Sequence, residues 1–308
     1  MTTRTGRIRW LVTGAGGKLG RDVAAELAGD PTAEVTAACR AALDITDAAA
    51  VREAVAGHDI VVNAAAWTDV DGAEAAEAAA TAVNGTAVRR LAEACRATGV
   101  LLLHVSSDYV FPGDAGKPYA EDASPAPLSA YGRGKLAGEQ AVVELLPRTG
   151  CVVRTAWLYG EHGRDFPATV LELAARQETL QVVNDQWGQP TWSRALARQL
   201  GRLGRAALAG RAPAGIYHGT AAGCTTWYGF ARTVFGLAGL DPARIRPVAS
   251  TAFPRPAPRP AFSALTHDRW TAAGMALLPP WQDSLAEAFR SPAFAGRAMA
   301  ARRASGEA

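Results

Sequence analysis

Short apolar runs alternate with amphipathic stretches through the first 160 residues of the chain. The apolar runs have the length of β-strands, and the stretches between them place apolar residues at the helical spacing of three and four. The predicted strands are 7–13, 34–38, 59–63, 100–106 and 151–155. Strands that alternate with helices in this way predict an α/β fold, in which a doubly wound parallel sheet lies between helices.

The pattern becomes less regular after about residue 160. It predicts a helix at 166–176, a strand at 180–183, a helix that ends near 209, a strand at 215–218 and a helix at 226–237. We therefore divide the chain into a first domain, residues 1–160, and a smaller, mainly C-terminal domain, residues 161–308, from which some segments can return to the first. The tail from about residue 293 is rich in Ala and Arg with Gly and Ser, and we expect it to be frayed.

Composition and charge exclude several classes of protein. The chain of 308 residues is 49% hydrophobic and 20% charged, with a net charge of +3 and no basic run, so neither nucleic acid nor a membrane is an expected partner. The apolar run at 8–12 is too short for a signal peptide or a span. The four Cys lie far apart, without a CxxC or Cys/His group, which predicts no disulfide framework, no metal site and a reduced cytoplasmic setting.

A glycine-rich turn joins the first strand to the helix that follows it. Gly14, Gly17 and Gly20 permit a tight turn, a close approach of the backbone to an anion and close packing of helix on strand. The N–H groups at the helix start favour a pyrophosphate. Because the turn stands between a strand and a helix, as a dinucleotide site requires, we predict a Rossmann-type cofactor domain; the alternative is a glycine turn that binds nothing.

The end of the second strand indicates which dinucleotide binds. A fold of this type that binds NAD usually carries an acidic residue there, whereas this chain has Ala38-Cys39-Arg40. Arg40 suits a 2′-phosphate, which favours NADPH over NADH; the alternative is that Arg40 is a solvated loop charge. Asp44 is placed to accept from the adenine amino group, and small residues after the third strand would let a cofactor lie against the backbone. Those residues are Asn63, Ala64, Ala65 and Ala66.

Tyr131 and Lys135 stand four residues apart in a predicted helix, which places a phenol and an ammonium on one face. A surface helix with one buried aromatic would show the same spacing. The fourth strand, however, ends in Ser106-Ser107-Asp108, and ligands of parallel sheets gather at the carboxyl ends of strands. The glycine turn, this strand end and the helix therefore converge on one predicted site.

Seven motifs, which occur in the order typical of the family, resemble the dTDP-4-dehydrorhamnose reductase family of extended short-chain dehydrogenases. They are TGAGGKLG at 13–20, VNAAAWTDVDGAE at 62–74, SSDYVFPG at 106–113, YGRGKLAGE at 131–139, RTAWLYG at 154–160, NDQWGQPT at 184–191 and RP at 259–260. The resemblance implies a Rossmann domain with a smaller, mainly C-terminal domain that binds a sugar nucleotide. The implied NADP contacts are Gly14, Gly16, Gly17, Lys18, Leu19, Arg40, Asp44, Ile45, Asn63, Ala64, Ala65, Ala66, Tyr131 and Lys135.

The resemblance also implies a catalytic triad of Ser107, Tyr131 and Lys135. Reduction of a ketone needs a hydride on carbon and a proton on oxygen. Tyr131 would give the proton, Lys135 would lower its pKa and hold the nicotinamide ribose, and Ser107 would donate a second hydrogen bond to the oxygen. The implied substrate contacts are Asp108, Trp157, Gln186 and Thr191. Arg259, in a Pro-rich loop, could clamp a phosphate, or that loop could be only a stiff connector.

The residue after Asp108 separates reduction from dehydration. Sugar-nucleotide 4,6-dehydratases place an Asp-Glu pair there, because elimination of water needs an acid and a base, whereas this chain has Asp108-Tyr109. Net reduction is therefore better supported. Two positions depart from the family: Gly134 stands where Ser or Thr is usual, which would loosen the helix start, and Phe262 stands where Asn is frequent, which affects the nucleotide or sugar contacts.

These observations predict NADPH-dependent reduction of the C4 ketone of a dTDP-4-keto-6-deoxyhexose, most simply dTDP-4-dehydrorhamnose. The alternative is a 4-ketoreductase for another dTDP-deoxysugar of antibiotic biosynthesis, including a dihydrostreptose-type synthase, because the sequence does not select the sugar. An alternative of another class is a non-catalytic NADP-binding subunit, like the beta subunit of methionine adenosyltransferase. The resemblance allows a homodimer, and no acidic cluster marks the magnesium ion that some members bind at a dimer contact.

Overall fold

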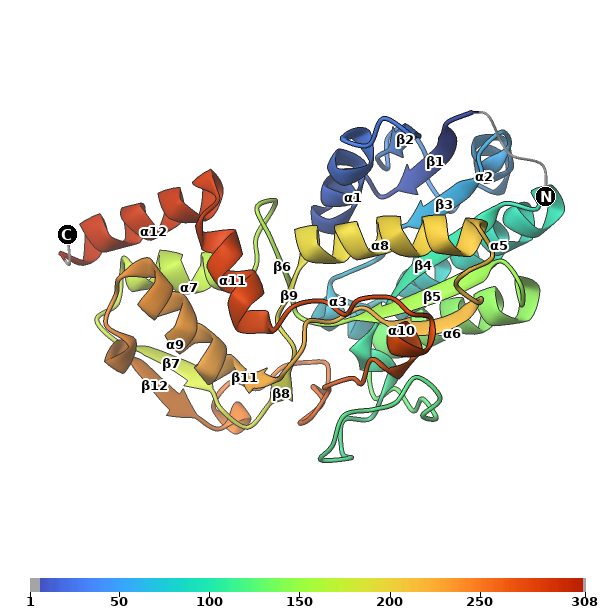
Figure 1. Ribbon diagram of the computed structural model, residues 1–308. Coiled ribbons are helices and arrows are strands. Elements are labelled where there is room, and N and C mark those ends of the chain that lie inside the picture. The colour runs from blue at the N-terminus through green and yellow to red at the C-terminus, as the bar shows by residue number, and fades with distance from the viewer. Residues whose placement is uncertain (1–5, 307–308) are drawn as a thin grey trace.

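The computed structural model describes residues 6–306, and its centre is a six-stranded parallel sheet (Figure 1). The order across the sheet is β2, β1, β3, β4, β5, β10. Their bounds are β1 (Ile8–Thr13), β2 (Ala33–Ala38), β3 (Ile60–Asn63), β4 (Leu101–Ser107), β5 (Gly150–Thr155) and β10 (Gly215–His218). The predicted α/β fold with a doubly wound parallel sheet is confirmed.

Helices cover both faces of this sheet because successive side chains of each strand point to opposite faces. Trp10 and Val12 of β1 pack under α1 and α8, whereas Leu11 packs under α2, α5 and α6. The bounds of these helices are α1 (Lys18–Ala28), α8 (Ser193–Leu208), α2 (Ala48–Val55), α5 (Ala87–Thr98) and α6 (Ala130–Leu145). Apolar residues on both faces of β1 therefore account for its continuous hydrophobic run.

The direction of winding reverses between β1 and β3. From β1 the chain moves to β2 on one side and then to β3 on the other, so the loops after β1 and β3 border an open crevice. Gly14 follows β1 with a positive φ of 68°, and a Cβ atom there would lie 2.5 Å from the Ala65 nitrogen in the loop after β3. A glycine at this position lets the two loops approach, which shapes the floor of the crevice.

A second, smaller lobe has a core of its own, which includes Tyr159, Phe230, Phe235 and Phe294. This small lobe, at the left of Figure 1, contains the parallel pair β7 and β12 and four helices. Their bounds are β7 (Leu180–Val183), β12 (Ile245–Val248), α7 (Phe166–Ala174), α9 (Trp227–Ala238), α11 (Trp281–Phe289) and α12 (Pro292–Ser305). Between α7 and α9 the chain returns to the large sheet, to which it adds α8 and β10.

The shorter elements connect the two lobes or lie at their edges. They are β6 (Leu158–Tyr159), β8 (Trp187–Gly188), β9 (Thr191–Trp192), β11 (Thr225–Thr226), α3 (Val70–Ala75), α4 (Glu77–Thr81), α10 (Asp268–Ala272), a π-helical turn (Ala82–Thr86) and 3₁₀ turns (Asp108–Val110, Pro242–Arg244, Ser250–Ala252). Strand β6 pairs with β9, and β8 pairs with β11. Apart from the six-stranded sheet, every sheet of the described chain has two strands.

The tail differs from the expectation that it would be frayed. Residues from Pro292 to Ser305 form helix α12, which buries Phe294, Ala298 and Ala301 against the small lobe and ends at Gly306. Its many Ala and Arg residues had suggested an unpacked tail, but the Ala side chains are small enough to let the helix lie close to its neighbours.

The described residues contain neither a membrane-spanning helix nor a group of metal ligands. Between residues 6 and 306 no helix has the length and apolar content that crossing a membrane requires. Within the same span, no three His, Cys, Asp or Glu side chains gather in a way that could hold a metal ion.

Candidate active site

A groove of about 930 Å³ opens at the carboxyl ends of the strands, where the winding reverses. This volume is within the range of cofactor and ligand sites. The groove is lined by most of the residues that the sequence predicted for the site. These are Gly14, Gly16, Gly17, Lys18, Leu19, Arg40, Asp44, Ile45, Ala64, Ala65, Ala66, Ser107, Asp108, Tyr131, Lys135 and Trp157.

The glycine-rich turn leaves the start of α1 open to an anion. Gly17 is the N-cap of α1 and supplies no side-chain cap, so the first N–H groups of the helix have no partner from that residue. A Cβ atom on Gly20 would collide with the carbonyl oxygen of Gly14, so only a glycine at this position lets the first turn of α1 pack against the preceding loop. The turn therefore has the geometry that a pyrophosphate needs: close backbone and free donors.

Arg40 and Asp44 lie together at one end of the groove. The Arg40 side chain is 88% exposed, and its Nε lies 3.6 Å from Asp44 Oδ2. The backbone N–H and hydroxyl of Thr46 donate to Asp44 Oδ1 at 2.9 and 2.7 Å, and these bonds hold the pKa of Asp44 below its usual value. Asp44 is thus a fixed, ionised acceptor, and Arg40 is an exposed cation beside it.

Helix α6 carries Tyr131 and Lys135 into the floor of the groove. Ser129 caps this helix by accepting from the Gly132 N–H at 3.1 Å, and a side chain on Gly132 would strike the carbonyl oxygen of Tyr109. The helix therefore lies against the end of β4, where Ser107 is placed. Helix α6 continues without a break through Gly134, so the expected loosening of the helix start is absent there.

Burial perturbs the pKa values of Tyr131 and Lys135, both on α6. It raises the pKa of Tyr131 to about 12, an effect opposed by a hydrogen bond with Ser107 and reinforced by the charge of Asp108. It lowers the pKa of Lys135 to about 8, against the influence of Glu139. The Lys135 ammonium donates to the carbonyl oxygen of Val105 at 2.7 Å. At neutral pH the site therefore holds a protonated phenol and a protonated ammonium.

Asp108 and Trp157 form the wall of the groove nearest the small lobe. Asp108 is buried and accepts from the Ser107 hydroxyl at 3.0 Å through Oδ1, while Oδ2 has no hydrogen-bond partner of good geometry among the described residues. Burial raises the pKa of Asp108 to about 6, against the opposing influence of the Ser263 and Ser107 hydroxyls. Trp157 has a φ of 45°, is stacked on Trp227 at 3.5 Å, and covers Gly188, where a Cβ atom would collide with it. A strained backbone held by such packing is typical of ligand sites.

Four predicted site residues do not line the groove. Asn63 lies beneath it, where its Oδ1 accepts from the Thr13 hydroxyl at 2.7 Å and from the Ala65 N–H at 3.2 Å. Thr191 is buried, and its hydroxyl donates to the Gln189 carbonyl at 3.1 Å. Gln186 is partly buried in the segment before β8. The roles given to these residues, and to the fourth one, Arg259, stay predictions.

Arg259 has a carboxylate partner. Its Nη1 and Nη2 donate to the two oxygens of Asp71 at 2.8 and 3.0 Å, and Arg255 lies 3.9 Å from the same carboxylate. The guanidinium of Arg259 lies 6.0 Å from the ring centre of Tyr109, which in turn meets Tyr131 edge to face at 5.7 Å. The ion pair therefore holds the Pro-rich loop against α3. Only the ring of Tyr109 separates Arg259 from Tyr131, the predicted proton donor.

Two more polar strand ends line the groove. Ser106 and Thr155 both face it, and their hydroxyl oxygens are buried without a partner among the described residues. Ser106 belongs to the strand end that the sequence placed at the site, whereas Thr155 was missed, although the rule that polar strand ends face the ligand could have identified it. His162, Gly163 and Arg164 also line the groove. They belong to a loop after β6, and no local pattern in the sequence marks them.

The fold and the groove together define an NAD(P)-dependent oxidoreductase of the extended short-chain dehydrogenase class. The chain belongs to the dTDP-4-dehydrorhamnose reductase family: the family described as RmlD substrate binding domain matches residues 8–293. The resemblance that the motifs carry is confirmed.

Named relatives cover almost the whole chain. The dTDP-4-dehydrorhamnose reductase of Streptomyces griseus is 55% identical over 294 residues, which are 95% of this chain and 96% of the relative. The dTDP-4-keto-6-deoxy-D-glucose reductase of Streptomyces niveus is 48% identical over 285 residues, 91% of this chain and 96% of the relative. A crystal structure of the dTDP-4-dehydrorhamnose reductase of Bacillus anthracis in complex with NADP has a TM-score of 0.86 and 34% identity, and covers 92% of this chain and 99% of that one.

Proposed function

We propose that this protein reduces the C4 ketone of a dTDP-4-keto-6-deoxyhexose with NADPH, most simply that of dTDP-4-dehydrorhamnose. The observation that carries the proposal is the meeting of Ser107, Tyr131 and Lys135 at the floor of a groove that begins at a glycine-rich turn. The relatives from two Streptomyces species and the NADP complex of the Bacillus anthracis reductase support the same reaction.

The three side chains divide the work of ketone reduction. NADPH, when bound, supplies the hydride that forms the new C–H bond at C4. Tyr131, whose raised pKa keeps it protonated at neutral pH, donates its phenolic proton to the carbonyl oxygen, which becomes a hydroxyl. Ser107 donates a hydrogen bond to the same oxygen as charge develops on it. Lys135, charged at neutral pH, lines the groove and uses one of its three N–H donors on the Val105 carbonyl, so the others would hold the nicotinamide ribose while the positive charge would lower the pKa of Tyr131.

Asp108 and Trp157 are suited to the sugar. The free oxygen of Asp108 can accept from a sugar hydroxyl, because a buried carboxylate without its full set of bonds is costly until a ligand supplies one. The Trp157 ring, fixed by Trp227 and Gly188, offers a flat apolar wall. At the other end of the groove Arg40 pairs with the 2′-phosphate of NADPH and Asp44 accepts from adenine.

Tyr109 favours reduction over dehydration. It occupies the place of the second carboxylate of the dehydratases, its ring is packed on Tyr131, and burial raises its pKa, so it cannot act as a base at neutral pH. Retention of Tyr131 and Lys135 in a formed groove favours an enzyme over a non-catalytic subunit. We place the reaction in the cytoplasm; a homodimer is tested by light scattering of the purified protein.

The decisive experiment follows NADPH absorbance with the purified protein and enzymatically made dTDP-4-keto-6-deoxyhexoses, with and without prior 3,5-epimerisation. We expect oxidation of NADPH with at least one of them, and NMR of the product identifies the sugar and the configuration at C4. A different preferred sugar would select a 4-ketoreductase of antibiotic biosynthesis. Absence of oxidation with every sugar would contradict the proposal.

A Tyr131→Phe variant tests the mechanism separately. It keeps the ring but removes the proton donor, so kcat should fall at least 100-fold, roughly the smallest contribution of a general acid, while the Kd of NADPH changes little. Fluorescence titration with NADPH and steady-state kinetics measure the two. Full turnover by this variant would refute the role of Tyr131 and leave the reaction itself standing.

A further inference from the structure

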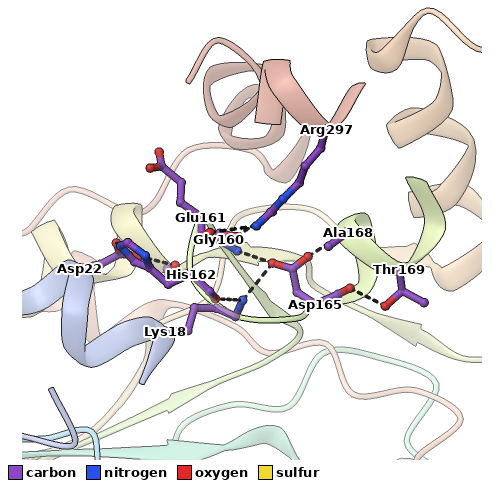
Figure 2. Close-up of polar contacts among 10 residues, drawn as sticks. Lys18, Asp22, Gly160, Glu161, His162, Asp165, Ala168, Thr169 and Arg297 are labelled. Carbon is purple, nitrogen blue, oxygen red and sulfur yellow. Dashed lines mark hydrogen bonds and ion pairs between the residues drawn. The ribbon is translucent and has the colours of Figure 1, made fainter. Parts of the chain in front are cut away.

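The loop of residues 160–165 connects three parts of the molecule (Figure 2). It follows β6, which comes directly after Trp157, and it leads into α7 of the small lobe. Its residues 162–164 line the groove opposite the glycine-rich turn. A shift of this loop would therefore alter the wall of the cofactor site and the segment that carries Trp157.

Asp165, at the end of this loop, is a buried junction. Its side chain is 1% exposed and receives hydrogen bonds from three different segments. Oδ1 accepts from the Ala168 N–H at 2.9 Å, which caps α7, and Oδ2 accepts from the Gly160 N–H at 2.9 Å, at the end of β6. The third donor is Lys18, whose Nζ lies 2.9 Å from Oδ2. A carboxylate that holds three segments together fixes their relative positions.

Lys18 is the link to the cofactor loop. It is the first residue of α1, directly after the glycine turn, yet its ammonium points to the 160–165 loop (Figure 2). There it donates to the His162 carbonyl oxygen at 2.6 Å as well as to Asp165, and only 17% of its side chain is exposed. Two short, shielded bonds make this contact stronger than an ordinary surface ion pair.

Further contacts hold the other side of the loop. Arg297 of α12 donates to the carbonyl oxygens of Gly160 and Glu161 at 3.4 and 2.9 Å. His162 Nε2 lies 3.7 Å from Oδ1 of Asp22 on α1, and Asp22 Oδ2 accepts from the Ser193 hydroxyl of α8 at 2.5 Å. The loop is thus held between α1 and the small lobe, and Lys18 supplies a charged contact from α1.

We propose that Asp165 is a positioning residue for the cofactor site: through Lys18 it fixes the 160–165 loop against the groove, and Lys18 acts on this loop instead of on a cofactor phosphate. The inference rests on the proposed cofactor groove, and it concerns residues whose role the reaction chemistry does not require. Lys18 and Asp165 then act as one unit, so that loss of either has the effect of losing both.

The test is a double-mutant cycle of Lys18→Met and Asp165→Asn, read as the Kd of NADPH by fluorescence titration. Met keeps the apolar stem of Lys18, and Asn keeps an oxygen to cap α7. We expect each single variant to weaken NADPH binding at least about tenfold, because each loses the shielded charged hydrogen bond between the two side chains. Lys18→Met also loses the bond to the His162 carbonyl, so the double variant should bind no more weakly than Lys18→Met. Lys117→Met and Asp283→Asn, both exposed and outside the groove, are matched controls that should leave the Kd unchanged.

Two results would overturn the inference. If Lys18→Met weakens binding while Asp165→Asn does not, Lys18 acts directly on the cofactor. If the two effects multiply in the double variant, the residues act independently. Melting temperatures of all variants separate a general loss of stability from a change confined to the groove.

Limited proteolysis tests the loop without any cofactor. Arg164 is 73% exposed, and trypsin should cut after it several-fold faster in the Lys18→Met variant than in the wild type or in Lys117→Met. An unchanged rate of cutting would mean that Lys18 does not hold the loop. Failure of the wild type to bind NADPH would remove the proposed function, and the proteolysis comparison would still decide the role of Lys18.

Discussion

Replacement of Glu139 by Gln should both destabilise the protein and change its pH profile. Glu139 lies one turn beyond Lys135 on α6 and forms an ion pair with Arg154 of β5, in which the two side chains are 2% and 1% exposed. The Arg154 Nε donates to both carboxylate oxygens at 3.0 and 3.1 Å, and Nη2 donates at 2.7 Å. The Arg154 guanidinium also stacks 4.8 Å above Phe111, so it cannot turn toward water when its partner is neutralised.

The expected cost follows from the burial of the pair. Removal of one partner leaves an uncompensated buried charge, which lowers the free energy of unfolding by about 3–5 kcal/mol. Glu144 provides a matched control on the same helix: its ion pair with Arg89 is equally short, 2.7 Å, but the side chains are 60% and 43% exposed. Glu144→Gln should therefore cost only about 0.2–1 kcal/mol. Urea unfolding followed by tryptophan fluorescence measures both variants, and equal costs would refute the argument from burial.

The effect on Lys135 gives a second measurement. The carboxylate of Glu139 raises the pKa of Lys135, while burial lowers it to about 8. Loss of the negative charge should therefore lower this pKa further, and the ammonium would be lost at a lower pH. If the charged form is the active one, the alkaline decline of kcat/KM moves to lower pH in Glu139→Gln and stays in place in Glu144→Gln. An alkaline limb that is the same in both variants would show that Glu139 does not act on Lys135.

The remaining predictions concern the groove and the glycines. Asp108→Asn should raise the KM of the sugar. Because burial raises the wild-type pKa to about 6 and makes ionisation costly, the variant should also gain about 2.4 kcal/mol of stability relative to the wild type between pH 4 and pH 7.5. Urea titrations that give the same difference at the two pH values would contradict this. Arg40→Ser should weaken NADPH at least about tenfold and leave NADH unchanged in fluorescence titrations, and an equal loss for both cofactors would refute the role of Arg40. Gly20→Ala should abolish NADPH binding, because the new Cβ would collide with the Gly14 carbonyl oxygen. Gly296→Ala in α12 is the control: its Cβ would meet no other atom, and it should raise the melting temperature. A Gly20→Ala variant that binds NADPH normally would show that the turn can open.

Local patterns predicted the parts of the site that a strand and its following turn determine. The turn after β1 and the end of β4 depend on residues close in sequence, so that Gly14, Gly17 and Ser107 could be recognised and placed at one edge of the sheet. The spacing of Tyr131 and Lys135 also predicted that both lie on one face of a helix, and the structure places them on α6.

Contacts between distant residues could not be predicted in this way. The partner of Lys18 is 147 positions away and that of Arg259 is 188 positions away, and neither pairing leaves a periodic signal. Helix α12 is held in place because Phe294 packs into the core of the small lobe, and the Ala and Arg content of the tail does not predict this contact. The same holds for Glu139 and Arg154, which are 15 residues apart on a helix and a strand and form a buried ion pair only because α6 packs on β5.

The late position of β10 and α8 in the chain affects how the protein is made. During synthesis from the N-terminus, β1 to β5 are complete before α8 is made. Until then, the sheet face with Trp10, Val12 and Leu103 is not covered by Leu196 and Leu200 of α8. A nascent chain that stalls near residue 160 therefore exposes a hydrophobic sheet face and the unpaired edge of β5. Both features favour binding by chaperones and aggregation. For the same reason the two lobes cannot be exchanged between relatives by a single crossover at that residue: a chimera needs at least three junctions, one near residue 160 and one on each side of the returning segment.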